Sequence, residues 1–552
     1  MKIKKRDNSL LRYACLFIGL LFIGHEIDND GWFLLNHGRY VLEYGIPYVE
    51  PFTIHENFSF VMQQWLSSLI FWEIYKYFGI DGLIIFLYPM GALTIYAIYR
   101  LTLMSAKGNK DVALVISSFI GIIICLFFIR TRPQIFSTLI FVVEIICLES
   151  LHRTNNKKYL LLFPFLSLAL INMHAAMWPM MIVFLIPFFF EHLVRYDTKN
   201  FFAKEKTIKL SYLCIITVLT MLAGFVNPYG GDAMTYVFRS YGYDMISNLV
   251  NEMQPITIRS ILGKFCEMLF FMVIFIYARH KVAVRYILLT LGTMVMAMSS
   301  LRSLYLFLAV GLYPLAYVYR EWQGLSNTHA PTAKAIRLRK VLILMTNGVF
   351  LWGIVNQQKI ILTGIESLGW VAALIMLTVF CLISFEWKYG KLRDVKDKFL
   401  RCGYISVVLL VCFSLMMVIG NKFAGINHLP NSAKAVEYIL AHESVDNVRL
   451  WTNYNEGAYA EFMGIRCFID PRAEVFLSSN NKQRDVFYEY ASLEKGSTDY
   501  RTFLSWYDFN YILVSDNDIM YTYLPSDDKY VLLLNYKTED GMNFCLYHIK
   551  DK

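Results

Sequence analysis

The 552-residue chain is too apolar for an ordinary soluble protein. Hydrophobic residues make up 57% of it, charged residues only 17%, and the mean hydropathy is +0.44. These values predict an integral membrane protein surrounded by membrane lipids. The formal net charge is +9, but Lys and Arg lie in short clusters between apolar runs rather than on one basic face, so nucleic acid is not the expected partner.

Apolar runs of membrane-spanning length predict about 13 transmembrane helices. A shorter run at residues 64–78 contains Glu73 and Lys76, so we expect it to lie at the membrane interface. The expected spans lie near residues 10–25, 82–103, 112–129, 135–151, 159–173, 177–194, 210–226, 263–279, 286–300, 303–319, 341–356, 360–385 and 403–420.

The distribution of Lys and Arg predicts the orientation of the chain. These residues concentrate at the N-terminus and in alternate loops, which places the N-terminus in the cytoplasm. An odd number of spans then puts the first loop, residues 26–80, and the tail, residues 421–552, on the outer side. The expected organisation is a transmembrane domain at 1–420 and an extracytoplasmic domain at 421–552.

The tail reads as a small α/β domain. Helical periodicity marks residues 432–442 and 457–462, and strand-like runs lie at 448–452, 466–469 and 511–514. No glycine-rich phosphate loop accompanies them, so a nucleotide site is not predicted.

Two acids, Asp28 and Asp30, directly follow the first span. A carboxylate above an apolar wall is poorly solvated, which raises its pKa toward values suited to a general base. Two carboxylates so close could also share a divalent cation. The alternative is a pair of ordinary hydrated acids at a helix end, and the local pattern leaves both interpretations open.

The first loop is expected to contain two interfacial helices. Residues 31–44 carry apolar and aromatic side chains on one side and Asn36, Arg39 and Glu43 on the other, and residues 64–78 form the second helix. A connector rich in Pro and Asn separates them.

The order of these elements resembles the GT-C superfamily of polyprenyl-phosphate-sugar-dependent glycosyltransferases. It is most similar to a poorly characterised bacterial branch with Asp-x-Asp-x-x-Trp in the first loop and Asp-x-Arg at a strand end of the tail. The residues that carry the resemblance are Asp28-Asn29-Asp30, Trp32-Phe33, Gly38-Arg39-Tyr40, Pro47 with Pro51-Phe52-Thr53, Gln64-Trp65-Leu66 and Asp470-Pro471-Arg472.

The resemblance implies an inverting transfer of a sugar from a polyprenyl-phosphate donor to a glycan, lipid or protein acceptor. The reaction would take place on the outer face of the bacterial cytoplasmic membrane. Asp28 or Asp30 would be the base, and family members differ in whether a metal assists. No cofactor follows with certainty, and a divalent ion would bind at Asp28 and Asp30 if anywhere.

Arginines on the outer side run against the charge bias, and a guanidinium binds phosphate oxygens well. Arg132, which precedes Pro133, and Arg302, between two apolar runs, are the stronger candidates for the donor phosphate; Arg130 and Arg259 are the others. For each of them, snorkelling to lipid headgroups is the alternative.

Further polar residues are expected to surround a shared cavity. For His174, a hydrogen-bonded interfacial role at a helix end is the alternative. The cavity candidates are Arg39, His55, Asn172, His174, Asn227 and Tyr229, and the outer-domain candidates are Asp470 and Arg472.

Three rival functions remain at this point. A transporter or flippase of lipid-linked saccharides would need charged residues along the spans, where Glu144 is the candidate. Glu267 lies nearer the outer end and would join the cavity, and a structural pairing is the alternative for both. An O-antigen polymerase or ligase would carry its key residues in a large late loop. A catalytically silent scaffold is the third. The density of polar residues in the first loop favours the transferase.

Overall fold

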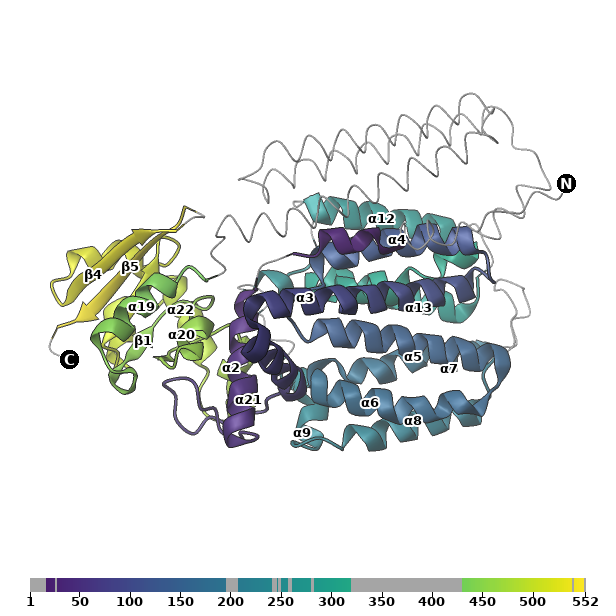
Figure 1. The fold of residues 1–552 in the computed structure, drawn as a ribbon, viewed down its shortest axis with the longest axis horizontal. Coiled ribbons are helices and arrows are strands. Elements are labelled where there is room, and N and C mark those ends of the chain that lie inside the picture. Colours follow the sequence, from purple (N-terminus) through teal and green to yellow (C-terminus); the bar gives the residue numbers. More distant parts are fainter. Residues whose placement is uncertain are drawn as a thin grey trace, which may run out of the picture.

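The computed structural model describes residues 16–24, 27–194, 207–240, 246, 250–256, 261–278, 282–318, 429–538 and 541–550. A bundle of helices carries a domain with a β-sheet at one end (Figure 1). The expected spans at 341–356, 360–385 and 403–420 lie outside the described residues, and so does Arg259. The count of about 13 spans therefore stays a prediction.

The bundle confirms the predicted multi-pass character of the chain. Within the described residues, four helices are long and apolar enough to cross a membrane: Trp65–Ser105, Lys110–Phe127, Gln134–Thr154 and Ala175–Leu193. The longer helices are α3 (Trp65–Ser105), α4 (Lys110–Phe127), α5 (Gln134–Thr154), α6 (Leu162–Met173), α7 (Pro179–Leu193), α8 (Leu210–Gly224), α12 (Ile261–Ala278) and α13 (Val284–Ser299).

Several predicted boundaries changed in the fold. The interfacial segment at 64–78 and the span at 82–103 are two parts of α3, which kinks at Gly79, where φ is 62°. Glycine suits this left-handed position because it has no Cβ. The expected span at 303–319 is broken in its first half into α14 (Leu304–Leu306) and a π-helical turn, Phe307–Gly311.

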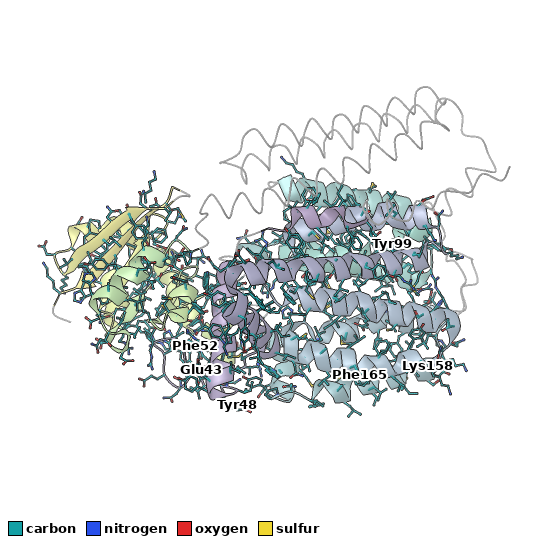
Figure 2. The ribbon with its side chains drawn as sticks, in the orientation of Figure 1. Glu43, Tyr48, Phe52, Tyr99, Lys158 and Phe165 are labelled. Atoms are coloured by element: carbon teal, nitrogen blue, oxygen red, sulfur yellow. The ribbon has the colours of Figure 1, made fainter. Side chains whose placement is uncertain are left out.

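Different kinds of side chain are found at the two ends of the bundle and on its side (Figure 2). Lys158 is exposed at the end far from the sheet domain, whereas Glu43 and Phe52 lie at the near end. Phe165 on α6 is 69% exposed on the side of the bundle, as expected for a side chain in contact with lipid.

Helix α2 (Asn29–Tyr44) lies across the near end of the bundle (Figure 1). Asp28 is its N-cap, and its carboxylate accepts from the Asp30 amide at 3.5 Å. Gly38 permits close packing on α3, since a Cβ there would meet the Ser68 carbonyl oxygen at 2.1 Å. The predicted interfacial helix is therefore packed against protein along most of its length, with residues 31–38 buried.

The C-terminal domain is built on a five-stranded sheet with the order β2-β1-β3-β5-β4. Strand β1 pairs in parallel with β2 and β3, and β5 pairs antiparallel with β3 and β4. The strands are β1 (Arg449–Trp451), β2 (Arg466–Cys467), β3 (Tyr511–Ser515), β4 (Tyr530–Lys537) and β5 (Asn543–Ile549).

Helices cover this sheet, and the predicted tail elements are present. The helices are α19 (Ala433–His442), α20 (Gly457–Phe462), α21 (Ser478–Asn481), α22 (Val486–Glu494), α23 (Tyr500–Ser505) and α24 (Met520–Tyr523). The hairpin of β4 and β5 was missed, although Asp540-Gly541 is a dipeptide typical of hairpin turns.

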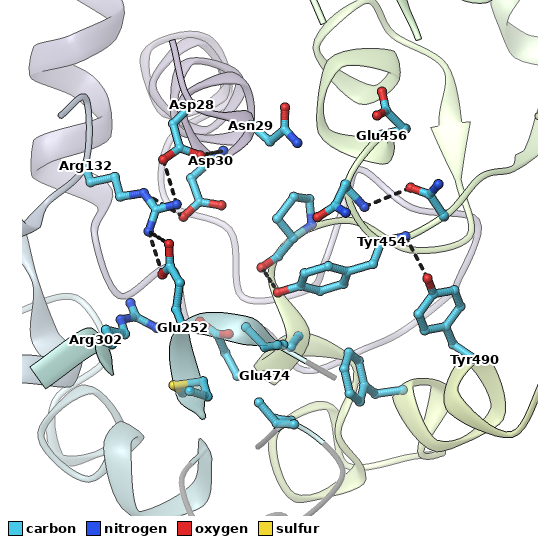
Figure 3. Close-up of a pocket in the computed structure, with 18 of the residues that line it drawn as sticks. Asp28, Asn29, Asp30, Arg132, Glu252, Arg302, Tyr454, Glu456, Glu474 and Tyr490 are labelled. Carbon is cyan, nitrogen blue, oxygen red and sulfur yellow. Dashed lines mark hydrogen bonds and ion pairs between the residues drawn. The ribbon is translucent and has the colours of Figure 1, made fainter. Parts of the chain in front are cut away.

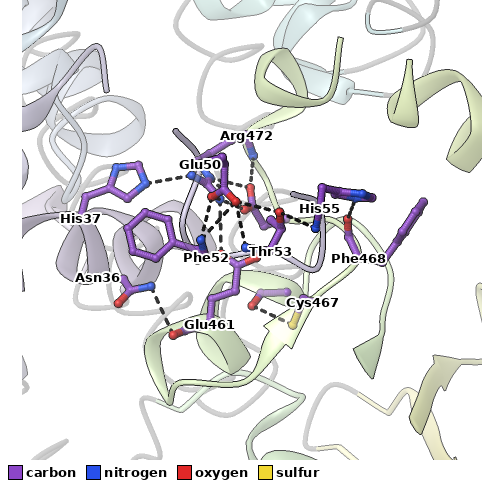
Figure 4. A network of polar contacts seen from close by, with 12 residues as sticks. Asn36, His37, Glu50, Phe52, Thr53, His55, Glu461, Cys467, Phe468 and Arg472 are labelled. Carbon is purple, nitrogen blue, oxygen red and sulfur yellow. Dashed lines mark hydrogen bonds and ion pairs between the residues drawn. The ribbon is translucent and has the colours of Figure 1, made fainter. Parts of the chain in front are cut away.

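A buried cluster around Arg472 joins the first loop to the C-terminal domain (Figure 4). The Arg472 guanidinium contacts Asp470, Glu50 at 3.0 Å and Glu461 at 3.4 Å, and its Nη1 lies 3.1 Å from His37 Nε2. All of these side chains are buried. The cluster holds three acids and one guanidinium, so the two parts of the chain are locked by charge as well as by apolar packing.

Replacing Arg472 by Met should destabilise the docked domain by about 3–5 kcal/mol, because Asp470, Glu50 and Glu461 would lose their buried counter-charge. Thermal unfolding and limited proteolysis of the detergent-solubilised chain measure this. The matched control is Arg484→Met, which removes a partly exposed ion pair with Glu489 and should cost about 0.5 kcal/mol or less. Equal losses in both variants would contradict the role of the cluster.

Candidate active site

A cavity of about 440 Å³ lies between the near end of the bundle and the C-terminal domain (Figure 3). Three regions far apart in the sequence line it. The first loop contributes Asp28, Asp30 and Gln63; the bundle and its loops contribute Arg132, His174, Glu252 and Arg302; the C-terminal domain contributes Tyr454, Glu474, Tyr490 and Glu494.

The guanidinium of Arg132 holds three carboxylates at one side of this cavity. Its Nη2 lies 2.7 Å from Asp28 Oδ2, its Nε lies 3.3 Å from Asp30 Oδ2, and its Nη1 donates to both oxygens of Glu252 at 2.7 Å. Pro133 follows Arg132 and caps α5, which fixes the direction in which the side chain leaves the backbone. The acid pair and Arg132, one of the two stronger arginine candidates, therefore contact each other.

The two aspartates have pKa values that are pushed apart. Burial raises the pKa of Asp30 to about 7; Arg132 opposes this shift, and the charges of Asp28 and Glu252 add to it. Burial also disfavours the charge on Asp28, but Arg132 and Arg130 outweigh it and hold the pKa of Asp28 below its ordinary value. A carboxylate that titrates near neutral pH is suited to general-base work, and its ionised neighbour is suited to holding a cation.

The proposed metal ligands bind a guanidinium in this structure. Arg132 lies against both Asp28 and Asp30, where a shared divalent cation would have to bind. Within the described ranges, no group of three His, Cys, Asp or Glu side chains is arranged to hold a metal ion. These residues therefore fit an ion-paired acid cluster better than a metal centre.

Two further arginine candidates lie close to this cluster. Arg302, in the turn Leu301–Ser303, lines the main cavity and also a pocket of about 120 Å³ with Phe127, Phe128 and Arg130. The guanidinium of Arg130 is half-exposed and lies 3.6 Å from Asp28 Oδ2. Arginine and aromatic side chains thus share one narrow opening beside the acids.

His174 lies in the cavity wall, after the end of α6. Its Nδ1 lies 3.2 Å from Ser137 Oγ. Burial, and then the charge of Arg302, lower its pKa to about 3. His174 is therefore neutral at physiological pH and acts as a polar wall residue rather than as a cation.

Asn172, Asn227 and Tyr229 do not line the main cavity. Asn172 accepts from Trp65 Nε1 at 3.0 Å and donates to the Val226 carbonyl. Asn227 donates to the carbonyls of Gly224 and Gly230, and the Tyr229 hydroxyl donates to the Pro47 carbonyl at 2.8 Å. The side chains of these three candidates therefore hold the loops around the site in place through hydrogen bonds.

Arg39, His55, Asp470 and Arg472 dock the C-terminal domain. Arg39 donates to the Phe462 carbonyl at 2.7 Å, and His55 Nε2 lies 2.8 Å from the Phe468 carbonyl oxygen. Asp470 and Arg472 belong to the buried cluster of Figure 4. Of these four, Arg472 reaches the edge of a small pocket that it shares with Asp30 and Arg132.

Sequence reasoning missed Glu252, Gln63 and Glu474. Glu252 lies in the short helix Asn251–Met253 and completes the cluster around Arg132. Gln63 donates to Glu474 Oε1 at 2.9 Å and accepts from the Ala176 amide, so it joins all three regions of the cavity. Each of the three lies in a connecting segment without periodicity, and no local pattern distinguishes them.

No family model matches the chain, and no curated protein matches it in sequence. Among solved structures, ArnT from Cupriavidus metallidurans bound to undecaprenyl phosphate aligns with a TM-score of 0.54 and 10% identity over 97% of both chains. The oligosaccharyltransferase of Archaeoglobus fulgidus, tethered with an acceptor peptide, aligns with a TM-score of 0.49 and 9% identity, over 98% of this chain and 74% of that one.

At such low identity the likeness to ArnT shows the fold alone. The chain shares the fold of ArnT, and the prediction of a helical membrane protein with a C-terminal α/β domain is confirmed at that level.

Replacing Arg132 by Lys should raise the pKa of Asp28 toward its ordinary value, because an ammonium cannot reproduce the fork that contacts three carboxylates. Infrared pH titration of the protonated-carboxyl band, taken as a difference against Asp28→Asn in the same background, measures this. The matched control is Arg130→Lys, which should shift the pKa much less because Arg130 is half-exposed. An unchanged Asp28 pKa in Arg132→Lys would contradict the described geometry.

Proposed function

We propose that the chain is an inverting GT-C-type glycosyltransferase that moves a sugar from a polyprenyl-phosphate donor to an acceptor hydroxyl. The observation that carries this proposal is the acid pair, with its divided pKa values, held by Arg132 in a cavity at the end of a membrane bundle. The GT-C-like fold supports it.

Asp30 is the base in this proposal. In its ionised form it accepts the proton of the acceptor hydroxyl while that oxygen forms a bond to the anomeric carbon of the donor sugar. The bond from the anomeric carbon to the phosphate oxygen breaks, and the phosphate leaves with the electron pair. Attack from the face opposite the phosphate inverts the anomeric centre. Asp28 stays ionised and keeps Arg132 oriented.

Arg132 and Arg302 stabilise the charge on the departing phosphate, with Arg130 at the open side. All three line the narrow pocket that Phe127 and Phe128 also form. An apolar and aromatic opening beside arginines suits a lipid phosphate whose chain remains among lipids. The structure of ArnT holds undecaprenyl phosphate, a ligand of this chemical class.

We infer that the reaction takes place on the outer face of the bacterial cytoplasmic membrane. The cavity lies at the end of the bundle opposite to the exposed, basic Lys158 end (Figure 2), and cytoplasmic ends carry the excess of Lys and Arg. The C-terminal domain would then be extracytoplasmic, as the charge pattern of the sequence predicts.

Replacing Asp30 by Asn should lower transfer by about 10²- to 10⁴-fold, because the base is lost. With the wild type, the rate should rise with pH up to about 7 and then level off, since Asp30 must be ionised to accept the proton. The measurement is transfer by the purified chain in lipid, with a panel of polyprenyl-phosphate sugars and acceptors.

The control for this experiment is Asp232→Asn, which removes an acid paired with Arg239 outside the cavity and should leave the rate unchanged. Full activity in Asp30→Asn would refute the mechanism, whether or not Asp28→Asn is also active. Movement of the donor across the bilayer without transfer would instead favour the flippase.

Replacing Arg302 by Met should weaken donor binding by about 10- to 100-fold, the usual cost of a lost charge-assisted hydrogen bond. Thermal protection of the chain by undecaprenyl phosphate measures this affinity. Arg239→Met is the matched control, because Arg239 pairs with Asp232 and does not line the cavity. Equal protection of the Arg302 variant and the wild type would remove Arg302 from the phosphate site.

A further inference from the structure

The two sides of the cavity differ in their charged groups (Figure 3): one side combines arginines with three acids, whereas the other side has acids alone. Among the described residues that line it, the arginines are Arg132 and Arg302, and both come from the bundle side. The wall formed by the C-terminal domain carries only acids among its charged residues. These acids are Glu456, Glu474, Glu494 and Asp518.

The C-terminal wall also presents aromatic and amide groups in fixed positions. The Tyr454 hydroxyl donates to the Pro471 carbonyl at 2.5 Å, and the Tyr454 amide donates to the Tyr490 hydroxyl at 3.3 Å. Asp518 accepts from the amide and the hydroxyl of Ser515 and from Asn453 Nδ2 at 3.1 Å. The wall is therefore rigid before any ligand binds, which lowers the cost of binding one.

Glu494 has unused hydrogen-bonding capacity in this wall. It ends α22, and its Oε1 is buried without a hydrogen-bond partner among the described residues. A backbone hydrogen bond from Ile519 reaches the same carboxyl, and burial, followed by the charge of Asp518, raises its pKa to about 8. A buried carboxyl that is mostly protonated at neutral pH can donate to a ligand hydroxyl as well as accept from one.

We propose that this C-terminal wall is the acceptor subsite and that it takes a saccharide without anionic groups, one hydroxyl of which binds Glu494. The inference rests on the proposed function, because it assigns the second substrate of the same cavity. Aromatic rings with amides and carboxyls suit the apolar faces and the hydroxyls of a sugar.

Charge explains why the saccharide lacks anionic groups. An anionic group on this wall would be removed from water and, among the described lining residues, would meet no cation from the same domain to compensate its charge. The two arginines lie on the opposite side, where the donor phosphate is proposed to bind. Because the arginines lie on one side alone, the donor phosphate and the acceptor would bind on opposite sides of the cavity.

The C-terminal wall and the acid pair line one continuous cavity. Tyr454 lines the same cavity as Asp30, and the two interact electrostatically. Pro471, whose carbonyl binds Tyr454, is followed by Arg472, which shares a small pocket with Asp30. A sugar on the tyrosines can therefore present a hydroxyl to Asp30.

The test uses the full chain in lipid nanodiscs and methyl glycosides of glucose, galactose and mannose, each with its amino-sugar and uronic-acid counterpart. Competition saturation-transfer NMR measures binding. We expect the neutral or amino form of at least one sugar to bind about tenfold or more tightly than its uronic acid. Absence of binding by every neutral glycoside, or tighter binding of the uronic acids, would overturn the proposal.

Two variants test the assignment of Glu494. Glu494→Ala should weaken binding of the neutral glycoside about fivefold, the cost of one hydrogen bond, and Glu494→Lys should reverse the order in favour of the uronic acid. The matched control is Glu437→Ala, which removes an exposed acid of α19 outside the cavity. Protection by undecaprenyl phosphate shows that each variant is folded, and unchanged glycoside binding in both Glu494 variants would overturn the assignment.

Asp30→Asn separates this inference from the proposed function. The variant should bind the glycosides as the wild type does while transfer is lost. Transfer that survives in Asp30→Asn refutes the proposed mechanism. Glycoside binding that is unchanged in both Glu494 variants refutes the acceptor subsite.

Discussion

The site depends on one buried guanidinium that is shared by more carboxylates than it can neutralise. Arg132 contacts Asp28, Asp30 and Glu252, and these residues come from the first loop and from two loops of the bundle. A buried charge needs a partner, so the arginine holds the three segments together. Burial raises the pKa of Asp30 to about 7 although Arg132 opposes this shift, so Asp30 is the acid of the three that keeps its proton up to near neutral pH.

A second arginine shared by several carboxylates attaches the C-terminal domain. Arg472 gathers Asp470, Glu50 and Glu461, and burial, with the charge of Asp470, raises the pKa of Glu461 well above its ordinary value. A third buried arginine, Arg285, pairs with Glu149 and Glu191 inside the bundle. In the sequence Arg285 reads as a charge in a cytoplasmic loop, but it is 1% exposed, so it contributes to packing rather than to the surface charge.

Docking of the C-terminal domain and assembly of the cavity are the same event. The segment that contains Asp470 and Arg472 also brings Pro471 and Glu474 to the cavity, and Glu474 accepts from Gln63 of the first loop. The domain therefore closes the space above the acid pair with an acidic and aromatic wall. Under the proposed function, the donor phosphate would bind on the arginine side of this space and the acceptor hydroxyl on the C-terminal side.

The sequence by itself determined what depends on local composition and periodicity. Hydropathy predicted the membrane bundle, and the periodicity of apolar residues predicted most elements of the tail. Arg132 and Arg302 became candidates because they lie on the outer side, against the charge bias. Only the tertiary structure decided which polar groups meet. Glu252, Gln63 and Glu474 joined the site, whereas Arg39 and His55 became docking residues. The reason is that burial and charge balance arise from contacts between segments far apart in the chain, which no local pattern encodes.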